Sequence, residues 1–290
     1  MRKVQFVSIR SWVRLLRPTH WRKNLIVFIP LFFAGGLPEA AVFTNVLLSF
    51  FSFCLVASAV YVLNDLMDVE NDRKHPTKRA RPIAAGEISE RVAAVTCIVL
   101  ALVSLVLAFA CAGLPGLGLV GLYALVNVGY SLGLKRVPIV DVVLLSAGYV
   151  IRMVFGALAS GVAISGWLYL TVMVGSFFLG LGKRRGEIDA VGTGSRAVLR
   201  GYTRDFLDKN MYVCLTLTMT FYALWARERP LRLATVPLVL LIFMRYSLDI
   251  EREGDGDPMN VVLHDPMLIG LVVLYALSAV FVVYFPGVYS

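Results

Sequence analysis

The chain has 290 residues, of which 58% are hydrophobic and only 16% are charged, and its mean hydropathy is +0.76. Soluble domains carry roughly 25% charged residues, and a soluble core could not bury this much apolar surface. The composition therefore predicts an integral membrane protein. The net charge of +9 is better explained by cytoplasmic loops and anionic ligands than by nucleic acid, so no nucleic-acid partner is expected.

Nine apolar segments reach or approach the roughly 17–25 residues that are needed to cross a bilayer. They are residues 24–37, 41–63, 91–112, 114–132, 138–161, 164–182, 210–226, 231–248 and 266–285. The predicted fold is an all-α integral membrane protein with nine transmembrane helices. Residues 8–20 are predicted to form an amphipathic helix on the membrane surface that ends at Pro18.

The connections between these segments differ in length and charge. Long, charged connections cover residues 64–90, 183–209 and 249–265. Lys and Arg concentrate before residue 24 and in the long connections, so the positive-inside rule places the N-terminus and these loops in the cytoplasm. The expected protein is a multi-pass protein of the cell (inner) membrane, with a single transmembrane catalytic domain over residues 1–290 and its active site on the cytoplasmic loops 64–90 and 183–209. Three bases on the opposite side have no explanation in the sequence: Arg227, Arg229 and Arg232.

The clearest chemical pattern is N-D-x-x-D-x-x-x-D, formed by Asn64, Asp65, Asp68 and Asp72 directly after an apolar segment. On a continuous helix these spacings return to one face, so the carboxylates would line a stripe about 10 Å long. Like charges this close need a cation, and hard oxygen ligands suit Mg²⁺, which leaves positions open for substrate phosphates. The alternative is a solvated helix end whose acids pair with the bases that follow. We favour a metal site in which the three aspartates are the ligands and the catalytic groups, with Asn64 orienting a carboxylate or binding directly.

Arg152 falls near the middle of the predicted fifth helix, where a charge costs roughly 2.5–3.5 kcal/mol even on a lenient insertion scale. Asp141 precedes it by eleven residues, which is three helical turns, so both side chains share one face. Contact with lipid is not expected for either. The sequence leaves open whether Arg152 faces a polar cavity or a partner inside the bundle.

Further polar residues gather at the predicted membrane edge. Arg presents paired donors to phosphate, so the cluster in GKRRGEID indicates phosphate binding, although such bases also anchor a chain at the membrane surface. The residues predicted to bind substrate are Lys23, Asn24, Asn64, Lys78, Arg79, Arg81, Tyr130, Lys135, Asp141, Arg152, Lys183, Arg184 and Arg185.

The segment NDLMDVENDRKHPTKRARPIAAG resembles the first aspartate-rich motif of the UbiA superfamily of intramembrane prenyltransferases. The resemblance implies a nine-helix bundle with a lipid-filled cavity that opens sideways, and Mg²⁺-dependent chemistry. The segments RPTHWRKN, YSLGLKRVPIVD, GKRRGE and RYSLDIE are similar to the branch that transfers 5-phosphoribosyl to decaprenyl phosphate. Together these motifs cover residues 17 to about 251.

One departure from the superfamily pattern is informative. Other members carry a second aspartate-rich motif after the sixth helix, where this chain reads KRRGEID, and Asp141 looks like the second motif of the branch. Phosphoribosyl diphosphate (PRPP) and a polyprenyl phosphate together present three anionic groups, which call for many bases. The resemblance thus implies transfer of 5-phosphoribosyl from PRPP to a polyprenyl (decaprenyl) phosphate, with release of diphosphate, in cell-wall arabinan precursor synthesis.

Two alternatives remain at this level. One is a prenyltransferase of the same fold, which would move a prenyl group from prenyl diphosphate to an aromatic acceptor. The other is a membrane transporter that uses the intramembrane charges, although the chain has no clear inverted repeat with broken helices. The sequence leaves open the lipid chain length, the number of Mg²⁺ ions and the oligomeric state, a homo-oligomer included.

Overall fold

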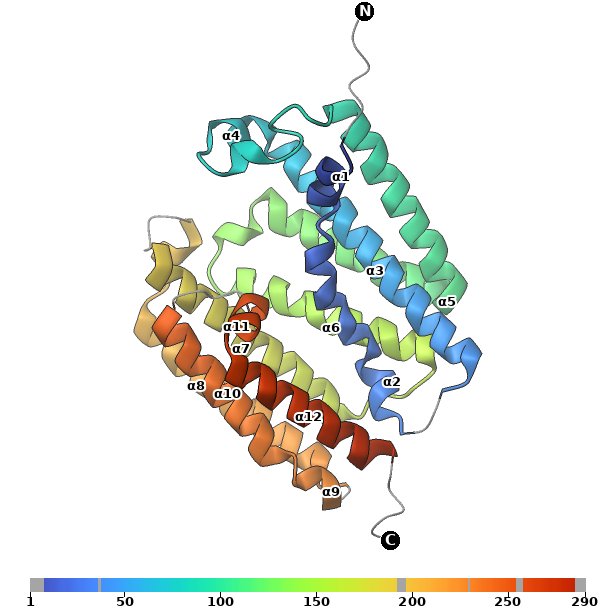
Figure 1. Cartoon of the computed structure of the whole chain (residues 1–290), viewed down its shortest axis with the longest axis vertical. Helices are drawn as coiled ribbons and strands as arrows, with labels where there is room; N and C mark the ends of the chain where they lie inside the picture. The colour runs from blue at the N-terminus through green and yellow to red at the C-terminus, as the bar shows by residue number, and fades with distance from the viewer. Residues whose placement is uncertain (1–7, 36–37, 192–196, 229, 254–257, 285–290) are drawn as a thin grey trace, which may run out of the picture. The chain divides into compact units, whose positions relative to one another are not determined.

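The structure is a computed structural model that describes residues 8–35, 38–191, 197–228, 230–253 and 258–284 (Figure 1). Every regular element in these ranges is a helix, which confirms the predicted all-α class. Arg229 lies outside the described residues, as do parts of the connections 183–209 and 249–265. The helices are α1 (Ile9–Leu16), η1 (Pro18–Phe28), α2 (Ile29–Phe33), α3 (Ala40–Met67), α4 (Val69–Lys74), η2 (Lys78–Ala80), α5 (Glu90–Leu132), η3 (Leu134–Arg136), α6 (Val140–Ser160), α7 (Gly166–Val191), η4 (Ala197–Gly201), α8 (Arg204–Ala226), α9 (Pro230–Leu233), α10 (Val236–Glu253), α11 (Pro258–His264) and α12 (Pro266–Tyr284).

Within the described ranges, six helices are long and apolar enough to cross a membrane, so the prediction of nine spans is not confirmed. They are α3, α5, α6, α7, the segment Leu231–Arg252 that contains α10, and α12. The two predicted spans 91–112 and 114–132 correspond to the two parts of α5, which are separate helices divided at Gly113, because its backbone (φ 61°, ψ −152°) is not helical and is one that glycine adopts readily. The predicted first span is not one α-helix but the 3₁₀ helix η1 followed by the five residues of α2.

The chain forms two compact units: Met1–Leu31, Glu39–Ser131 and Arg152–Val162 make up unit 1, and Phe32–Pro38, Leu132–Ile151 and Ala163–Ser290 make up unit 2. In unit 1, α1 and η1 pack on α3. The hydroxyls of Ser52 in α3 and Ser104 in α5 each donate to the other's backbone carbonyl, at 2.9 and 2.8 Å. Such paired hydroxyl bonds let two apolar helices approach closely inside a bilayer.

A close backbone approach fixes η1 against α6 within unit 1. A Cβ atom on Gly156 would lie 1.9 Å from the carbonyl oxygen of Val27, so only glycine fits at this crossing. The residues of η1 that face the unit's interior include Asn24, whose side chain is fully buried. The glycine therefore decides where the polar residues of η1 lie.

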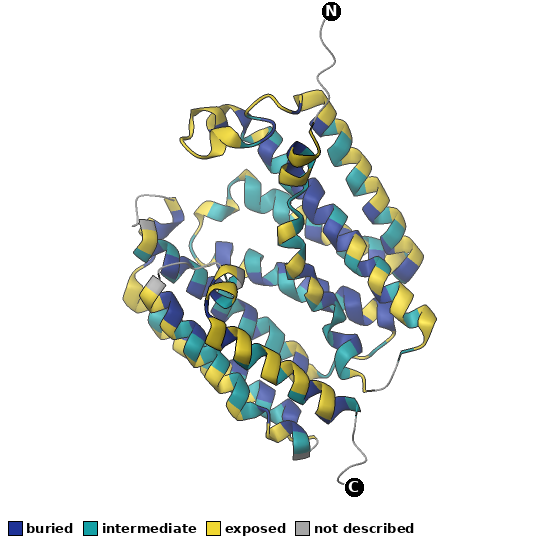
Figure 2. Ribbon diagram, viewed as in Figure 1, coloured by how far each residue is buried: buried dark blue, intermediate teal, exposed yellow. Residues whose placement is uncertain are grey.

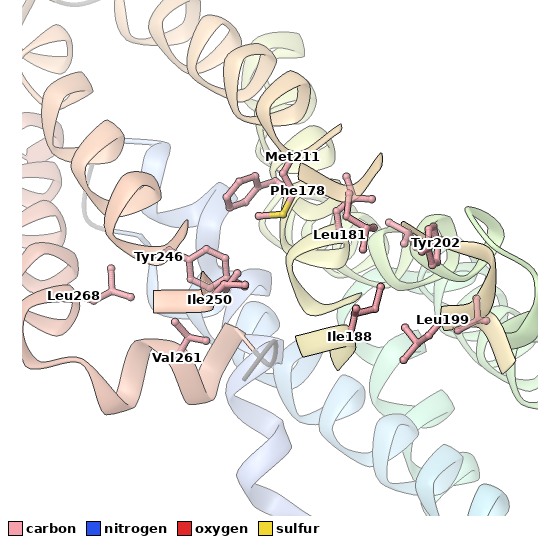
Figure 3. Packing of buried hydrophobic residues seen from close by; sticks show 13 residues of the cluster. Phe178, Leu181, Ile188, Leu199, Tyr202, Met211, Tyr246, Ile250, Val261 and Leu268 are labelled. Carbon is pink, nitrogen blue, oxygen red and sulfur yellow. The ribbon is translucent and has the colours of Figure 1, made fainter. Parts of the chain in front are cut away.

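In unit 2, α7 packs along α8, and α10 lies against both. Figure 3 shows the apolar core of this unit, to which α7 contributes Phe178 and Leu181, α10 contributes Tyr246 and Ile250, and α12 contributes Leu268. This core reaches the short segments η4 and α11, so the connection after α7 is anchored where it is described.

Large apolar side chains also cover the outside of the long helices. Figure 2 shows many exposed positions along α5 and α12. On α5 they include Val95, Ile98 and Leu102, and on α12 they include Leu274 and Leu277. Exposed apolar surface on helices of this length is what contact with lipid tails requires, and the chain is a multi-pass membrane protein.

Candidate active site

The aspartate-rich segment lies on two helices rather than one. Asp65 is in the last turn of α3, Asp68 (φ −99°, ψ 7°) ends that helix, and Asp72 belongs to the short helix α4. The single helix that was predicted to carry all three carboxylates is therefore interrupted at Asp68, where the backbone leaves the helical conformation. Asp65 and Asp72 are each only 2% exposed, whereas Asp68 is half-buried.

Two arginines hold the buried carboxylates. Nη2 of Arg17 lies 2.7 Å from Oδ1 and 2.8 Å from Oδ2 of Asp65. Nη1 of Arg81 lies 3.0 Å from Oδ1 of Asp65 and 2.7 Å from Oδ2 of Asp72. Arg81 thus bridges the two acids across the break between α3 and α4, and the negative charges of the motif are balanced by bases within unit 1.

A cavity of about 410 Å³ lies beside these ion pairs, within unit 1. The guanidinium of Arg17 also stacks over the ring of Tyr61, at 5.0 Å from its centroid, and Nδ1 of His20 lies 3.1 Å from the Tyr61 hydroxyl. The lining is dominated by cationic side chains, which suits an anionic ligand. The lining residues are Arg14, Arg17, His20, Asp65, Thr77, Ala80, Arg81 and Pro82.

The sequence predicted Asp65 and Arg81 for this site but missed Arg14, Arg17 and His20. These three come from α1 and η1, a segment that was interpreted as lying on the membrane surface. The motif RPTHWRKN, which contains Arg17 and His20, was the available signal. Its local geometry depends on Arg17, whose left-handed backbone (φ 52°, ψ 56°) separates α1 from η1.

Helix α1 is fixed beside the cavity by both apolar and polar contacts. Leu15 is fully buried in a cluster with residues of α3, α4, α5 and the loop before α5. The Ser11 hydroxyl donates to Oε2 of Glu87 at 2.5 Å, and Arg14 pairs with the same carboxylate and donates to the Ala80 carbonyl at 3.2 Å. The hydrogen bond from Ser11, together with Arg14, lowers the pKa of the Glu87 carboxyl. The amphipathic segment therefore forms one wall of the site.

The oxygen atoms of the aspartate-rich segment fit a divalent cation in kind. Within the described ranges, no group of three or more His, Cys, Asp or Glu side chains is arranged to hold a metal ion. However, Oδ1 of Asn64 is buried and accepts no hydrogen bond, and this amide precedes Asp68 by one helical turn. An unpaired buried oxygen is costly, and amide and carboxylate oxygens are the ligands that Mg²⁺ prefers. Asn64 and the neighbouring acids can therefore contribute to a metal site.

Arg152 has partners inside unit 1. Its Nε lies 2.6 Å from Oδ1 of Asn24, and its Nη2 lies 2.9 Å from the Tyr123 hydroxyl. The guanidinium also lies over the rings of Tyr123 and Phe53, at 4.7 and 5.4 Å. An amide oxygen, a phenol and two ring faces thus surround a buried cation, and the predicted residue Asn24 accepts a hydrogen bond from it.

A second polar cluster lies in unit 2 around Asp141, which is fully buried. Its Oδ2 accepts from Nε of Arg184 at 2.6 Å, and its Oδ1 accepts from the Tyr202 hydroxyl at 2.6 Å. The Tyr202 oxygen in turn accepts from the backbone N–H of Ile139 at 2.5 Å, where the backbone is left-handed (φ 70°). Burial, and then the hydrogen bond to Asp141, raise the pKa of Tyr202, so its hydroxyl stays protonated and donates.

The bases of GKRRGEID lie on a helix and not in a loop, because α7 continues as far as Val191. Arg184 is fully buried and also pairs with Glu187 at 2.6 Å. Arg185 is bound by Asp208 of α8 at 2.7 Å and by Asp189. These two bases therefore link helices within unit 2.

The structure places the remaining predicted site residues as follows. Lys78 and Arg79 are exposed on η2, close in sequence to the cavity-lining residues Thr77, Ala80 and Arg81. Lys23, on η1, is half-buried, as are Tyr130, Lys135 and Lys183. The roles of all these side chains in substrate binding stay predictions.

The described helices define a multi-pass membrane protein, and arginines line a cavity in its unit 1. The sequence pattern of the UbiA prenyltransferase family matches residues 25–272, and the chain therefore belongs to this family. Family membership agrees with the resemblance that the aspartate-rich motif carries.

Two relatives are similar over most of both chains. The decaprenyl-phosphate phosphoribosyltransferase of Corynebacterium glutamicum is 33% identical over 287 residues, which are 94% of this chain and 86% of the relative. The decaprenyl-phosphate phosphoribosyltransferase of Mycobacterium tuberculosis is 35% identical over 270 residues, which are 88% of each chain.

Among solved structures, a UbiA homolog from Archaeoglobus fulgidus bound to DMAPP and Mg²⁺ has a TM-score of 0.71 with 22% sequence identity. The match covers 94% of this chain and 98% of that one. A digeranylgeranylglyceryl phosphate synthase has a TM-score of 0.68 with 17% identity. At these identities the likeness concerns the fold alone.

Proposed function

We propose that this protein is a membrane phosphoribosyltransferase that moves 5-phosphoribosyl from PRPP to a polyprenyl phosphate, decaprenyl phosphate in the first instance, and releases diphosphate. The observation that carries the proposal is the 33–35% identity to decaprenyl-phosphate phosphoribosyltransferases over almost the full length of both partners. The basic cavity in unit 1 supports it, because every substrate of this reaction is a phosphate or diphosphate.

The cavity would hold PRPP, the phosphoribosyl donor. Its arginines offer paired N–H donors that match phosphate oxygens. Lys78 and Arg79, which are exposed on η2, extend the same basic surface. A prenyl diphosphate has one anionic group, whereas PRPP carries a diphosphate and a 5-phosphate, so the number of bases favours PRPP.

Asn64, Asp68 and Asp72 are proposed to hold Mg²⁺ at the donor diphosphate, and the sequence prediction adds Asp65. The ion would supply positive charge where negative charge develops on the departing diphosphate. In the transfer, an oxygen of the lipid phosphate forms a bond to C1 of the ribose while the bond from C1 to the diphosphate oxygen breaks, and the electron pair leaves with diphosphate. A lipid phosphate is already ionised near neutral pH, so the residues need to orient it rather than remove a proton.

Arg152 and Lys23 are proposed to serve the acceptor. Arg152 is a buried cation in an apolar helix, and Lys23 lies on η1 one residue before Asn24, which binds Arg152. Further phosphate ligands are proposed to be Tyr130, Lys135 and Lys183. The loop that lines the cavity is proposed to face the cytoplasm.

The deciding experiment uses the purified protein in detergent. It should transfer label from PRPP to decaprenyl phosphate, with diphosphate released in equal amount. A parallel mixture contains a prenyl diphosphate and an aromatic acid. Labelled lipid in the second mixture alone would replace the proposal with aromatic prenyl transfer, and ion or solute flux in liposomes without either reaction would favour a transporter.

A further inference from the structure

Asp65 accepts more hydrogen bonds from arginine than Asp72 does. A carboxylate has about four lone-pair positions, and Arg17 takes one on each oxygen while Arg81 takes a third. Asp72 accepts from Arg81 through one oxygen only. With 2% of its surface exposed, Asp65 has little room for a metal ion unless a guanidinium leaves.

The two arginines keep donors for another ligand. Arg17 reaches Asp65 through Nη2, and Arg81 reaches both acids through Nη1. Within the described part of the chain, Nε and Nη1 of Arg17 and Nε and Nη2 of Arg81 make no hydrogen bond. Both side chains line the cavity and are about a quarter exposed, at 22% and 27%. Their remaining N–H groups are available to a ligand there.

The backbone also directs Arg17 to this position. A left-handed conformation costs roughly 1–2 kcal/mol for a residue with a side chain, and here it precedes a proline. The fork to Asp65 and the stacking over Tyr61 hold the residue in it. Backbone strain that surrounding contacts maintain is common where a side chain must be aimed at a ligand.

We propose that Asp65 is a positioning residue, which orients Arg17 and Arg81 so that their remaining N–H groups bind a phosphate of the donor, and that it is not a metal ligand. Arg17, which the sequence did not single out, becomes a donor-binding residue. This inference rests on the proposed function, since it assigns roles within the same site. It divides the aspartates into one that orients arginines and others that bind the cation.

The test separates metal binding from donor binding. Mn²⁺ binding is measured by electron paramagnetic resonance without substrate, and PRPP binding by calorimetry with Mg²⁺ present and no acceptor. Asp65→Asn should leave the Mn²⁺ affinity within about twofold and weaken PRPP roughly tenfold or more, the range for losing hydrogen bonds to a charged group. Asp68→Asn, the matched variant in the same motif, should lose Mn²⁺ binding.

A double-mutant cycle tests whether Asp65 acts through Arg17. The variant with both Asp65→Asn and Arg17→Gln should bind PRPP no more weakly than the poorer single variant, because the two changes remove one interaction. Arg22→Gln controls for general charge loss, since Arg22 is exposed and bonds only the Thr19 carbonyl. If Asp65→Asn does not fold, Arg17→Lys replaces it in the test. This variant keeps the charge but loses the guanidinium N–H groups, so it should weaken PRPP binding without changing the Mn²⁺ affinity.

Each negative outcome has a distinct meaning. Loss of Mn²⁺ binding in Asp65→Asn, at the level of Asp68→Asn, would make Asp65 a metal ligand and overturn the inference. Additive effects of Asp65→Asn and Arg17→Gln on PRPP would overturn the coupling. Failure of the unmodified protein to bind PRPP would instead overturn the proposed function.

Discussion

Asp141 and Arg184 form an ion pair at 2.6 Å in which neither side chain is more than 1% exposed. Both residues were predicted as substrate ligands at a membrane edge. Their burial gives them a measurable structural role: they join α6 to α7, and Tyr202 adds the segment after η4. Buried pairs of this kind are costly to break, because removing one partner leaves the other charge desolvated.

We therefore expect Asp141→Asn to lower the free energy of unfolding by about 3–5 kcal/mol. Tyr202→Phe should lower it by about 1–3 kcal/mol, because Asp141 and the Ile139 N–H each lose a partner. Chemical unfolding in detergent, followed by tryptophan fluorescence, measures both. Tyr212→Phe is the control, since Tyr212 is 62% exposed. Equal stability of Tyr202→Phe and the unmodified protein would contradict the assignment.

Replacing Gly156 by alanine should destabilise the protein, whereas the same change at a control glycine should stabilise it. Gly156→Ala would place a Cβ 1.9 Å from the Val27 carbonyl oxygen, so η1 must shift. We expect a loss of about 1–3 kcal/mol, as for overpacked cores, and reduced transfer activity, because η1 carries His20 and Lys23. Gly118→Ala in α5 meets nothing within 4 Å and should stabilise the helix by up to ~1 kcal/mol. Thermal unfolding of both variants decides; a neutral Gly156→Ala would mean that η1 does not lie where the structure places it.

The contact between α1 and Glu87 should depend on pH. The pKa of Glu87 is lowered in the folded protein, so folding favours the ionised carboxylate. Its contribution is fully present above the ordinary value of ~4.3 and is lost as the pH falls through the lowered value. Hydrogen exchange in α1, corrected for intrinsic rates, should be slow at neutral pH and faster below about pH 4.

The variant Glu87→Gln identifies the group responsible. At neutral pH its α1 should exchange as fast as that of the unmodified protein in acid. Glu70→Gln is the control, because Glu70 is exposed and contacts only Arg73. Unchanged α1 exchange in Glu87→Gln would show that apolar contacts of Leu15 suffice to hold the helix.

Removal of divalent cations tests the proposed metal site directly. Chelation should stop phosphoribosyl transfer, and Mg²⁺ should restore it. Asp68→Asn should reduce kcat by about 100-fold or more, as for loss of a group that stabilises the leaving charge. Glu70→Gln, two residues away, should transfer at the normal rate. Full activity of the unmodified protein in chelator would remove the metal from the proposal.

The sequence by itself determined the class of protein and singled out the aspartate-rich motif. Its apolar runs predict membrane helices, because an element inside a bilayer must be apolar and must satisfy its own backbone hydrogen bonds. The acids from Asp65 to Asp72 and the base Arg81 are evident from their spacing alone. The spacing of the aspartates could not show that the helix ends at Asp68, because the same spacing fits one continuous helix. Only the backbone conformation of Asp68 shows that there are two helices.

Tertiary structure decided which charges meet. Arg17 and Asp65 are 48 residues apart in the chain and share a fork of hydrogen bonds. Asp141 and Arg184, 43 residues apart, form a buried ion pair. Sequence periodicity indicates on which side of a helix a residue lies, but not which residue of another segment contacts it. The ion-pair partner of a charged side chain depends on how folding brings distant segments together. That partner influences whether the side chain is available to a ligand or stabilises the fold.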